Sequence, residues 1–242
     1  WAGQPASFVG WLARQRPVIE IMTTQPKEST SNNQLLFVRQ FMTDFFHMGA
    51  ILPSSRYLGQ AGAAYLAQKQ GPVTVLEVGS GTGSFTREIV PLLDAGDRLD
   101  MVEINTGLIA YLRTRFAEEP EFKVKPGVDV NFINSDIRIL AGDFAYDYIV
   151  FSLPLTNFPP EMVEDILSLM LKRLKPGGVF SYVKYAFISR FKYLFGGAAT
   201  RTAMTQNQQL ISEFADHYQI EQRLVWLNVP PAWTFYWQKP VS

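Results

Sequence analysis

A run of apolar residues that ends in closely spaced glycines constrains this chain more than any other feature. Residues 73–78 are mostly apolar, and Gly79, Gly81 and Gly83 follow at every second position. Glycine lets the backbone turn tightly and approach a ligand. The residues from Phe85 onward are typical of a helix, whose first N–H groups would point towards that ligand. The pattern predicts a buried strand, a binding turn and a helix.

The glycine spacing and a neighbouring acid narrow the kind of ligand. A dinucleotide site favours G-x-G-x-x-G, but here the spacing is G-x-G-x-G and Ser84 stands where the third glycine would be. Glu77 precedes the first glycine by two residues, and a carboxylate there fits a pyrophosphate poorly. We expect Glu77 to bind a cationic amino group such as that of a methionine moiety.

From residue 73 onward the sequence alternates between predicted strands and helices. Repeated β-α-β order predicts a parallel sheet with helices on both faces. Two final strands joined by a short proline-rich turn predict an antiparallel last strand. Strands are expected at 73–78, 98–104, 128–134, 146–153, 179–185, 220–227 and 233–238, and helices at 85–93, 106–117, 159–174 and 206–217, with a Pro-Gly-Gly turn at 176–178.

The residues before this alternation divide into a lead and a helical extension. Residues 1–33 end in a stretch that is nearly all polar, which predicts a disordered or extraneous lead, and Met22 is a candidate start. Apolar side chains recur at helical spacing over residues 34–49, and a second helix is expected over 57–70. The predicted parts are therefore a lead over 1–33, membrane-facing or lid helices over 34–70, and an α/β domain over 71–242.

Two more carboxylates follow later predicted strands. Glu103 ends the second strand about 20 residues after the glycine turn, where an acid can accept from both ribose hydroxyls. Asp136 follows the third strand, and it can accept from the exocyclic amine of adenine while Ile137 packs against the ring. Each acid alone would more often be a surface carboxylate or a helix cap. Three acids at the tips of three successive strands are much more specific.

These features resemble class I S-adenosylmethionine-dependent methyltransferases over about residues 73–238. The resemblance implies a Rossmann-like fold with a seven-stranded, mostly parallel sheet and an antiparallel last strand. It also implies S-adenosylmethionine as the cofactor. The candidate cofactor-binding residues are Glu77, Gly79, Ser80, Gly81, Thr82, Gly83, Glu103, Ile104, Asp136, Ile137, Ser152 and Ser55.

The end of the fourth predicted strand reads Ser152-Leu153-Pro154-Leu155, and in this fold it lies beside the transferred methyl group. Methyltransferases that act on the amines of nucleic-acid bases carry Asn/Asp-Pro-Pro-Tyr there, which holds a planar amine by hydrogen bonds and stacking. Because the amide and the aromatic ring are both missing, a flat base is a less natural substrate.

Two aromatic segments flank the expected site. One is the Phe-rich helix over 34–49, and the other is the segment 185–195, which mixes aromatic residues with Arg190 and Lys192. Such a mixture is typical of an interfacial segment that meets anionic headgroups. Either segment alone could equally belong to the core or to a subunit contact. Together, at opposite ends of one rim, they favour a lipid surface.

The chain resembles one family in particular, the bacterial phospholipid N-methyltransferases that methylate phosphatidylethanolamine. The matching pieces are the stretches 41–56, 152–155 and 226–232, while 187–201 departs from the family pattern. The resemblance implies that residues 34–49 form a membrane-binding helix and that the protein lies peripherally on the inner membrane, facing the cytoplasm. The products would be the mono-, di- or trimethylated lipid.

The expected reaction is direct displacement, in which a neutral amine attacks the sulfonium methyl group in line. Proximity and alignment can supply most of the acceleration. Backbone carbonyls at Ser152 and Leu153 are candidates to orient the amine. The candidate proton acceptors are His47, Tyr57, Tyr185 and water, and the bases of the segment 185–195 are candidates to hold the lipid phosphate.

Composition bears on the alternatives. With 22 basic and 22 acidic residues the formal net charge is zero, which disfavours nucleic acid as a partner. The chain has no cysteine and two histidines, so we expect no metal site, and no apolar run is long enough to span a bilayer. We expect a monomer or a weak dimer. The rival functions are an rRNA adenine N6-dimethyltransferase-like enzyme, a small-molecule methyltransferase and a non-enzymatic cofactor-binding protein.

Overall fold

The computed structural model describes residues 54–140, 142, 145–155, 158–186 and 197–241. The predicted lead over 1–33, the helix over 34–49, His47 and nearly all of the segment 185–195 lie outside these residues. The predicted division of the chain into three parts therefore stays a prediction. Among the described residues, no helix is both long and apolar enough to cross a membrane.

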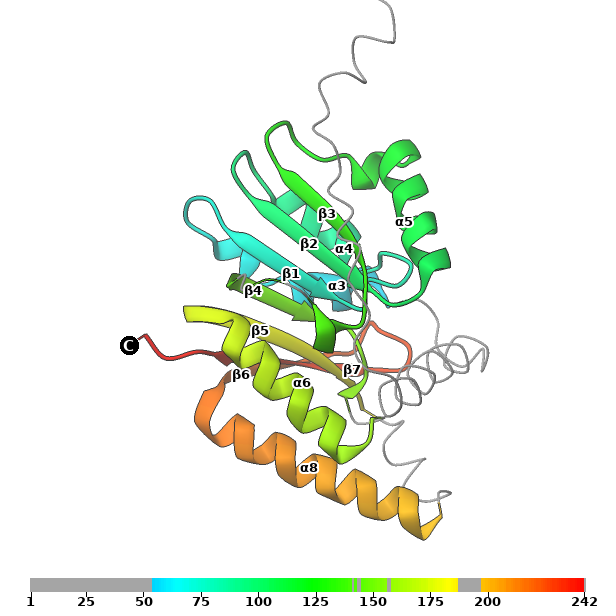
Figure 1. Cartoon of the computed structure of the whole chain (residues 1–242), viewed down its shortest axis with the longest axis vertical. Helices are drawn as coiled ribbons and strands as arrows, with labels where there is room; N and C mark the ends of the chain where they lie inside the picture. The colour runs from blue at the N-terminus through cyan, green and yellow to red at the C-terminus, as the bar shows by residue number, and fades with distance from the viewer. Residues whose placement is uncertain (1–53, 141, 143–144, 156–157, 187–196, 242) are drawn as a thin grey trace, which may run out of the picture.

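One seven-stranded sheet runs through the centre of the protein in the order β3-β2-β1-β4-β5-β7-β6 (Figure 1). β7 is antiparallel to both of its neighbours, and every other pairing is parallel. The predicted Rossmann-like class, with seven strands and an antiparallel last strand, is confirmed. The strands are β1 (Thr74–Val78), β2 (Arg98–Glu103), β3 (Asp129–Asn134), β4 (Tyr146–Phe151), β5 (Leu174–Tyr185), β6 (Gln219–Val225) and β7 (Ala232–Gln238).

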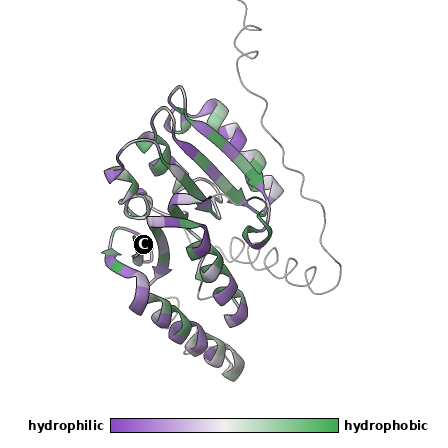
Figure 2. Cartoon of the chain, turned by 60° about the vertical axis from the view of Figure 1, so that its left-hand side comes forward, coloured by the Kyte–Doolittle hydropathy of each residue, from purple (hydrophilic) through white to green (hydrophobic). Residues whose placement is uncertain are grey.

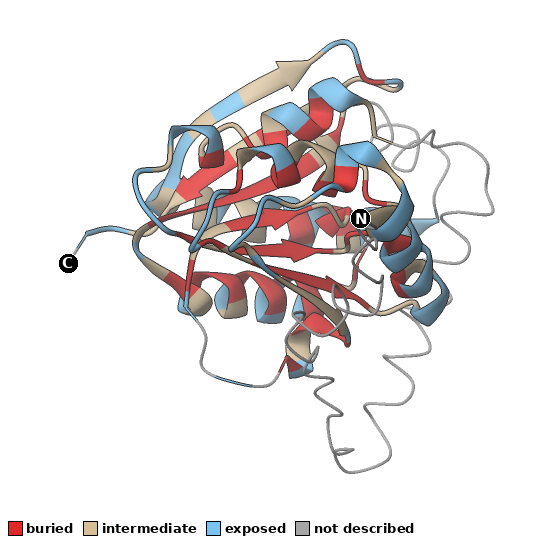
Figure 3. Cartoon of the chain, turned by 90° about the horizontal axis from the view of Figure 1, so that it is seen from above, coloured by how far each residue is buried: buried red, intermediate tan, exposed pale blue. Residues whose placement is uncertain are grey.

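Helices cover both faces of the sheet, which becomes the buried centre of the molecule (Figure 3). On one face, α6 and α8 pack on apolar side chains of β1, β4, β5 and β7. On the other, α3, α4 and the short helices beside them pack on β1, β2 and β5. The outer surface of α8 is mostly hydrophilic (Figure 2). The helices are α3 (Arg56–Gly62), α4 (Thr86–Ile89), α5 (Thr106–Glu118), α6 (Pro160–Arg173) and α8 (Ala198–Tyr218), with 3-10 turns η1 (Leu66–Gln68), η2 (Val90–Leu92), η3 (Pro120–Phe122) and η4 (Ile137–Ile139).

The strand order reverses between β1 and β4. From β1 the chain winds outward to β2 and β3, and then returns to the other side of β1 to form β4. In open parallel sheets, ligands bind beyond the carboxyl ends of the strands at such a switch point. The fold therefore places a binding site where β1, β2 and β4 end.

The second predicted helix is wrong in its extent. It was expected over residues 57–70, but α3 ends at Gly62 and only a short 3-10 turn follows. The reason lies in the sheet beneath it. Ser181 donates to the carbonyl of Gly62 over 2.8 Å, and the hydroxyl of Tyr236 donates to the carbonyl of Ala61. These side chains take the carbonyls that a longer helix would use.

Other element bounds also differ from the sequence expectation. α8 begins at residue 198, eight residues before the predicted start at 206. The hydroxyls of Thr202 and Thr205 donate to carbonyls one turn earlier, which lets these polar residues lie within a helix. The helix predicted over 85–93 becomes α4 and the 3-10 turn η2, where Pro91 supplies no N–H.

Two strands end or begin at unexpected places. β5 starts at Leu174 rather than 179, because the predicted Pro-Gly-Gly turn is a bulge inside the strand whose backbone bonds to Lys239 at the end of β7. β4 ends at Phe151, two residues before the expected end, where Leu153 turns inward to pack against Gly79.

Candidate active site

The glycine turn after β1 is held in a conformation that only glycine accommodates well. Gly79 has φ +76°, and Gly81 and Gly83 also have positive φ. A Cβ atom on Gly79 would lie 2.3 Å from Cδ2 of Leu153. The amide of Gly79 donates to the carbonyl of Val102 over 2.8 Å, so the turn is tied to β2. The turn therefore presents bare backbone at the sheet's carboxyl edge.

Glu77 lies at the floor of this turn and is fully buried. The hydroxyl of Thr86, the first residue of α4, donates to both of its carboxylate oxygens, over 3.0 and 2.7 Å. Burial is the largest effect on this carboxyl group and raises its pKa to about 7, against the lowering effect of Thr86 and with a smaller contribution from the charge of Glu103. No cation among the described residues lies beside this carboxylate, which makes it a natural site for an ammonium group.

Glu103, at the end of β2, joins the glycine turn to the next loop. One of its oxygens accepts from the amide of Gly81 over 3.0 Å, and the other accepts from the amide of Asn105 over 2.9 Å. The side chain is 1% exposed, and burial raises its pKa. Each oxygen keeps a lone pair for a further donor. The carboxylate can therefore accept from the two hydroxyls of a ribose.

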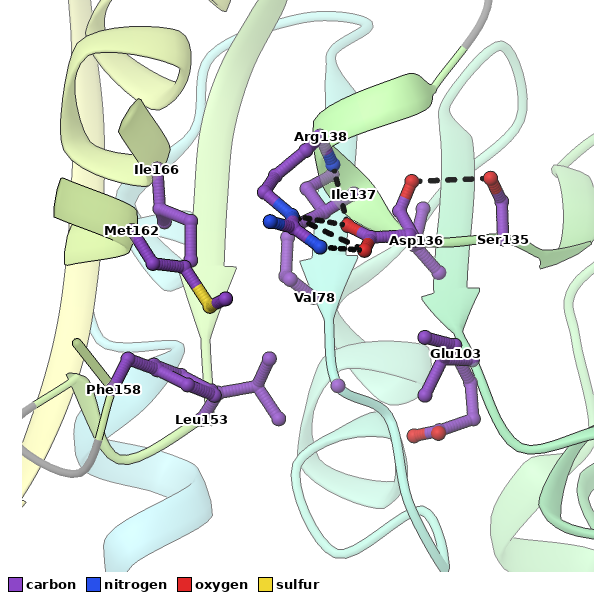
Figure 4. A pocket seen from close by; sticks show the side chains of 13 residues that line it. Val78, Glu103, Ser135, Asp136, Ile137, Arg138, Leu153, Phe158, Met162 and Ile166 are labelled. Atoms are coloured by element: carbon purple, nitrogen blue, oxygen red, sulfur yellow. Dashed lines mark hydrogen bonds and ion pairs between the residues drawn. The ribbon is translucent and has the colours of Figure 1, made fainter. Parts of the chain in front are cut away.

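Asp136 follows β3 and caps the short helix η4, as its Oδ1 accepts from the amide of Arg138 over 2.9 Å. The guanidinium of Arg138 also folds back onto the same carboxylate, with Nε 3.1 Å from each oxygen. Both residues line the cleft (Figure 4). The sequence alone gave no reason to expect this ion pair at the predicted adenine end.

A cleft of about 420 Å³, counting its open mouth, is lined by Gly79, Glu103 and Asp136, whereas Glu77 is buried behind the glycine turn and does not line it. Figure 4 shows its two sides, with apolar side chains of the α6 region facing the two carboxylates. Met162 and Ile166 are one turn apart on α6, and both are buried. The cleft thus combines an apolar slot for a flat ring with acceptors at its edge. Its lining is Val78, Gly79, Val102, Glu103, Ile104, Ser135, Asp136, Ile137, Arg138, Leu153, Phe158, Met162 and Ile166.

Ser152 fastens the end of β4 to the glycine turn. Its amide and its hydroxyl each donate to the carbonyl of Val78 over 3.1 Å, and the hydroxyl also donates to the carbonyl of Gly79. Leu153, the next residue, lines the cleft. The loop after β4 is therefore packed directly on the turn, as its place at the switch point requires.

The structure does not bring every candidate residue to the cleft. The hydroxyl of Ser55 caps α3 by accepting from the amide of Leu58 over 3.3 Å. Tyr185 lies at the end of β5, where its hydroxyl is 3.4 Å from Oγ of Ser54 and burial raises its pKa. Ser80 is buried within the glycine turn, and the carbonyl of Thr82 accepts from Arg115. His47 lies outside the described residues.

Several site residues were missed from the sequence. Thr86 is one, although a hydroxyl residue in the first turn of the helix after the glycine turn is a signal that could have drawn attention to it. Met162 and Ile166 share the apolar face of a predicted helix, but nothing in their spacing distinguishes a cleft from a core. Arg138 meets Asp136 only through the shape of η4.

Comparisons with known proteins agree with this geometry. Residues 75–178 match the family model described as a methyltransferase domain. The ornithine lipid N-methyltransferase of Singulisphaera acidiphila is 28% identical over 148 residues, which cover 61% of this chain and 76% of that protein. The ribosomal RNA small subunit methyltransferase A of Pseudomonas syringae pv. syringae is 37% identical over 79 residues, but these cover 30% of this chain and 28% of that protein.

A solved structure shares the fold. The magnesium protoporphyrin IX methyltransferase of Synechocystis PCC 6803, with bound S-adenosylmethionine, superposes with a TM-score of 0.53 at 13% identity, over 76% of this chain and 80% of that chain. Sheet order, glycine turn and cleft define a Rossmann-like methyltransferase domain. Residues 75–178 form a methyltransferase domain of the class I, S-adenosylmethionine-dependent type, and the chain resembles lipid N-methyltransferases.

Proposed function

We propose that this methyltransferase acts on the headgroup amine of a membrane lipid, with phosphatidylethanolamine as the first candidate and an ornithine lipid as the second. The observation that carries the proposal is the extent of the similarity to a lipid N-methyltransferase, which covers most of that protein's length. The similarity to the ribosomal RNA enzyme covers about a quarter of its length. The loop at 152–155 adds support, because it lacks the amide and the aromatic ring that would hold a flat base.

The three acids divide the cofactor between them in this proposal. Glu77 accepts from the ammonium of the methionine moiety, Glu103 from the ribose and Asp136 from the adenine amine. The apolar residues Ile137 and Met162 enclose the ring. When bound, S-adenosylmethionine supplies an electrophilic methyl group on its sulfonium. The carboxylates and the slot explain why this chain would bind such a molecule in one orientation.

The transfer itself needs alignment more than acid–base strength. The amine would attack the methyl group that the bound cofactor supplies, in exchange for the bond from that methyl group to sulfur, so the amine must have lost its proton beforehand. Because burial raises the pKa of Tyr185, its phenol is protonated at neutral pH and is a poor base. Water, or His47 outside the described residues, remains the proposed acceptor. Backbone carbonyls of Ser152 and Leu153 orient the amine.

Lys184 supplies a positive charge on the substrate side. In the sheet, Tyr182 of β5 pairs with Phe151 of β4. Lys184 lies two residues beyond Tyr182, as Leu153 does beyond Phe151, so the two are neighbours on the sheet face that carries the cleft. Lys184 is partly buried, burial lowers its pKa, and no hydrogen bond or ion pair joins its ammonium group to another described residue. Such a cation supports a substrate that carries negative charge near its amine, as phosphatidylethanolamine does.

The surroundings of the site belong to the same proposal. The helix over 34–49 and the segment 185–195 would bind the membrane surface, with Arg190 and Lys192 near the headgroups. The protein would act as a monomer or weak dimer on the cytoplasmic side of the inner membrane, without nucleic acid.

In the test, the purified protein is incubated with labelled S-adenosylmethionine and with vesicles that contain phosphatidylethanolamine, an ornithine lipid or both. The expected result is label in phosphatidylethanolamine and in its more highly methylated forms. Label in the ornithine lipid alone would move the proposal to that substrate. Label in ribosomal RNA or in a soluble amine, with none in lipid, would overturn it.

A matched pair of variants shows that the activity belongs to this cleft. Glu103→Gln keeps the shape of the side chain but replaces one acceptor with a donor, and we expect methyl transfer to fall at least tenfold. Glu118→Gln makes the same change on the exposed end of α5 and is expected to leave transfer unchanged.

A further inference from the structure

The tip of the β6–β7 hairpin, residues 226–231, presents large apolar side chains to solvent. Trp226 is 68% exposed, Leu227 is 64% exposed and Val229 is 69% exposed. Three such side chains lie within four residues of one hairpin tip, whereas single exposed apolar residues are ordinary. Neither the cofactor cleft nor the glycine turn uses them.

The exposure is built into a well-anchored loop. The side chain of Asn228, between the exposed residues, is buried at 2% exposure. It accepts from the amide of Ser55 over 2.9 Å and donates to the carbonyl of Pro230 over 2.7 Å. The carbonyl of Pro231 accepts from the amide of Ala186 over 2.9 Å. The polar residue therefore fixes the loop from inside, and its apolar neighbours are left facing outward.

The hairpin tip lies at the edge of the sheet that carries the active site. β6 runs in the same direction as β5, because both are antiparallel to β7. Its carboxyl end, and hence the tip, is at the edge where β1, β2 and β4 also end (Figure 1). A surface that touched the tip would therefore also face the mouth of the substrate side.

The charges around the tip suit an anionic surface. The stretch 225–232 carries no charged residue, and the adjoining turn at 54–57 carries one, Arg56, which is exposed. Tyr57 beside it is 48% exposed. Tryptophan and tyrosine favour the interface between headgroups and acyl chains, and a basic residue beside them favours anionic lipid.

We propose that the hairpin tip inserts into the interfacial region of an anionic phospholipid bilayer and so sets the active site over its lipid substrate. This inference rests on the proposed lipid substrate and adds a contact site that is separate from the segments 34–49 and 185–195. Trp226 and Leu227 enter the interface, while Arg56 meets the headgroups.

The test compares the full chain with the double variant Trp226→Ser/Leu227→Ser on vesicles of phosphatidylethanolamine and phosphatidylglycerol. We expect the variant to bind vesicles about tenfold more weakly, since it removes two apolar side chains from the contact. In the wild type, lipids brominated on their acyl chains should quench tryptophan fluorescence, and the quenching should be lost in Trp226→Phe. Equal vesicle binding by wild type and double variant would overturn the proposal.

The matched control is the double variant Ile220→Ser/Val241→Ser. Ile220, near the start of β6, is 46% exposed, and Val241, just beyond the end of β7, is 80% exposed. Both lie at the end of the hairpin opposite its tip, so we expect wild-type vesicle binding. Methyl transfer to detergent-dispersed lipid tests the proposed function without a bilayer. The variant Trp226→Ser/Leu227→Ser should keep this activity in full, which separates the inference about the hairpin tip from the proposed function. If the wild-type protein binds vesicles but does not methylate their lipids, the proposed lipid substrate is wrong, and the inference about the hairpin tip still stands. A change from dimer to monomer without weaker vesicle binding would identify the tip as a self-association surface and overturn the inference.

Discussion

At the scale of single residues, the site depends on a buried acid whose environment opposes its charge. Glu77 has no exposed surface, and its pKa rises to about 7 from an ordinary 4.5 chiefly because of burial. Thr86 holds both oxygens, and Glu103 adds a second negative charge nearby. When such a buried acid is charged, it lowers the stability of the folded protein. A bound cation would offset this effect, which is why the site favours a cation.

The pH dependence of stability tests this cost. Since the pKa of Glu77 is raised in the folded state, its stabilising contribution is complete below about pH 4.5 and is lost as pH rises through about 7. The loss amounts to about 3 kcal/mol for this fully buried group. We expect Glu77→Gln to lack this loss. The free energies of urea unfolding of the ligand-free variant and the ligand-free wild type should therefore diverge between about pH 5 and about pH 8. Parallel pH profiles would show that Glu77 keeps an ordinary pKa.

Thr86 is expected to act on cofactor affinity through Glu77. Thr86→Val keeps the volume but removes the hydroxyl that donates to the two carboxylate oxygens, so it favours the protonated acid and should weaken S-adenosylmethionine binding about tenfold at neutral pH. Calorimetric titration measures this directly. The comparison is Thr114→Val on the exposed face of α5, whose hydroxyl donates to the carbonyl of Ala110. Unchanged affinity in both variants would remove Thr86 from the site.

At the scale of elements, α3 ends where side chains of the sheet take its last carbonyls and where it packs closely on Phe85, the residue before α4. A Cβ atom on Gly62 would lie 2.6 Å from Cε1 of Phe85, whose ring is 3% exposed and has little room to move. The carbonyl of Gly62 is also taken by Ser181. Helical spacing in the sequence shows neither fact, which is why the helix was predicted to continue to residue 70.

A single methyl group should therefore be costly there. We expect Gly62→Ala to lower the free energy of unfolding by about 1–3 kcal/mol, because the ring of Phe85 must shift within a packed core. Gly197→Ala is the matched change, since a Cβ atom there meets nothing within 4 Å. Denaturant unfolding of the two variants gives the difference, and equal stabilities would mean that α3 and α4 separate easily.

At the scale of the whole molecule, the cofactor cleft joins parts of the chain that are far apart in sequence. Its walls come from the ends of β1, β2 and β4, from η4 and from α6. A ligand that bridges these parts binds only the folded protein and shifts the folding equilibrium by mass action.

S-adenosylmethionine should accordingly stabilise the protein as a unit. At about 100 times its Kd it adds about 2.7 kcal/mol, which corresponds to a Tm increase of roughly 5 to 10 °C for a chain of this size. Differential scanning calorimetry measures the shift. Glu103→Gln should show much less of it, and Glu118→Gln should show all of it. A full shift in Glu103→Gln would mean that the cofactor binds elsewhere.

The sequence by itself determined the class of fold and the order of its elements. Alternating apolar strands and helices specify a parallel sheet because each element must bury an apolar face. The glycines at 79, 81 and 83 specify the turn, since their positive φ is a local requirement. Glu77, Glu103 and Asp136 could be placed at one edge for the same reason, because parallel strands bring their carboxyl ends together.

Only the tertiary structure decided what those residues touch. That Thr86 holds Glu77, that Arg138 folds onto Asp136 and that Ser152 fastens β4 to the glycine turn all depend on contacts between separate elements. The outward apolar tip at 226–231 depends likewise on Asn228 reaching Ser55, 173 positions away. The spacing of apolar residues along the sequence indicates which face of a helix or strand is buried. Which residues cover that face depends on how all the elements pack together.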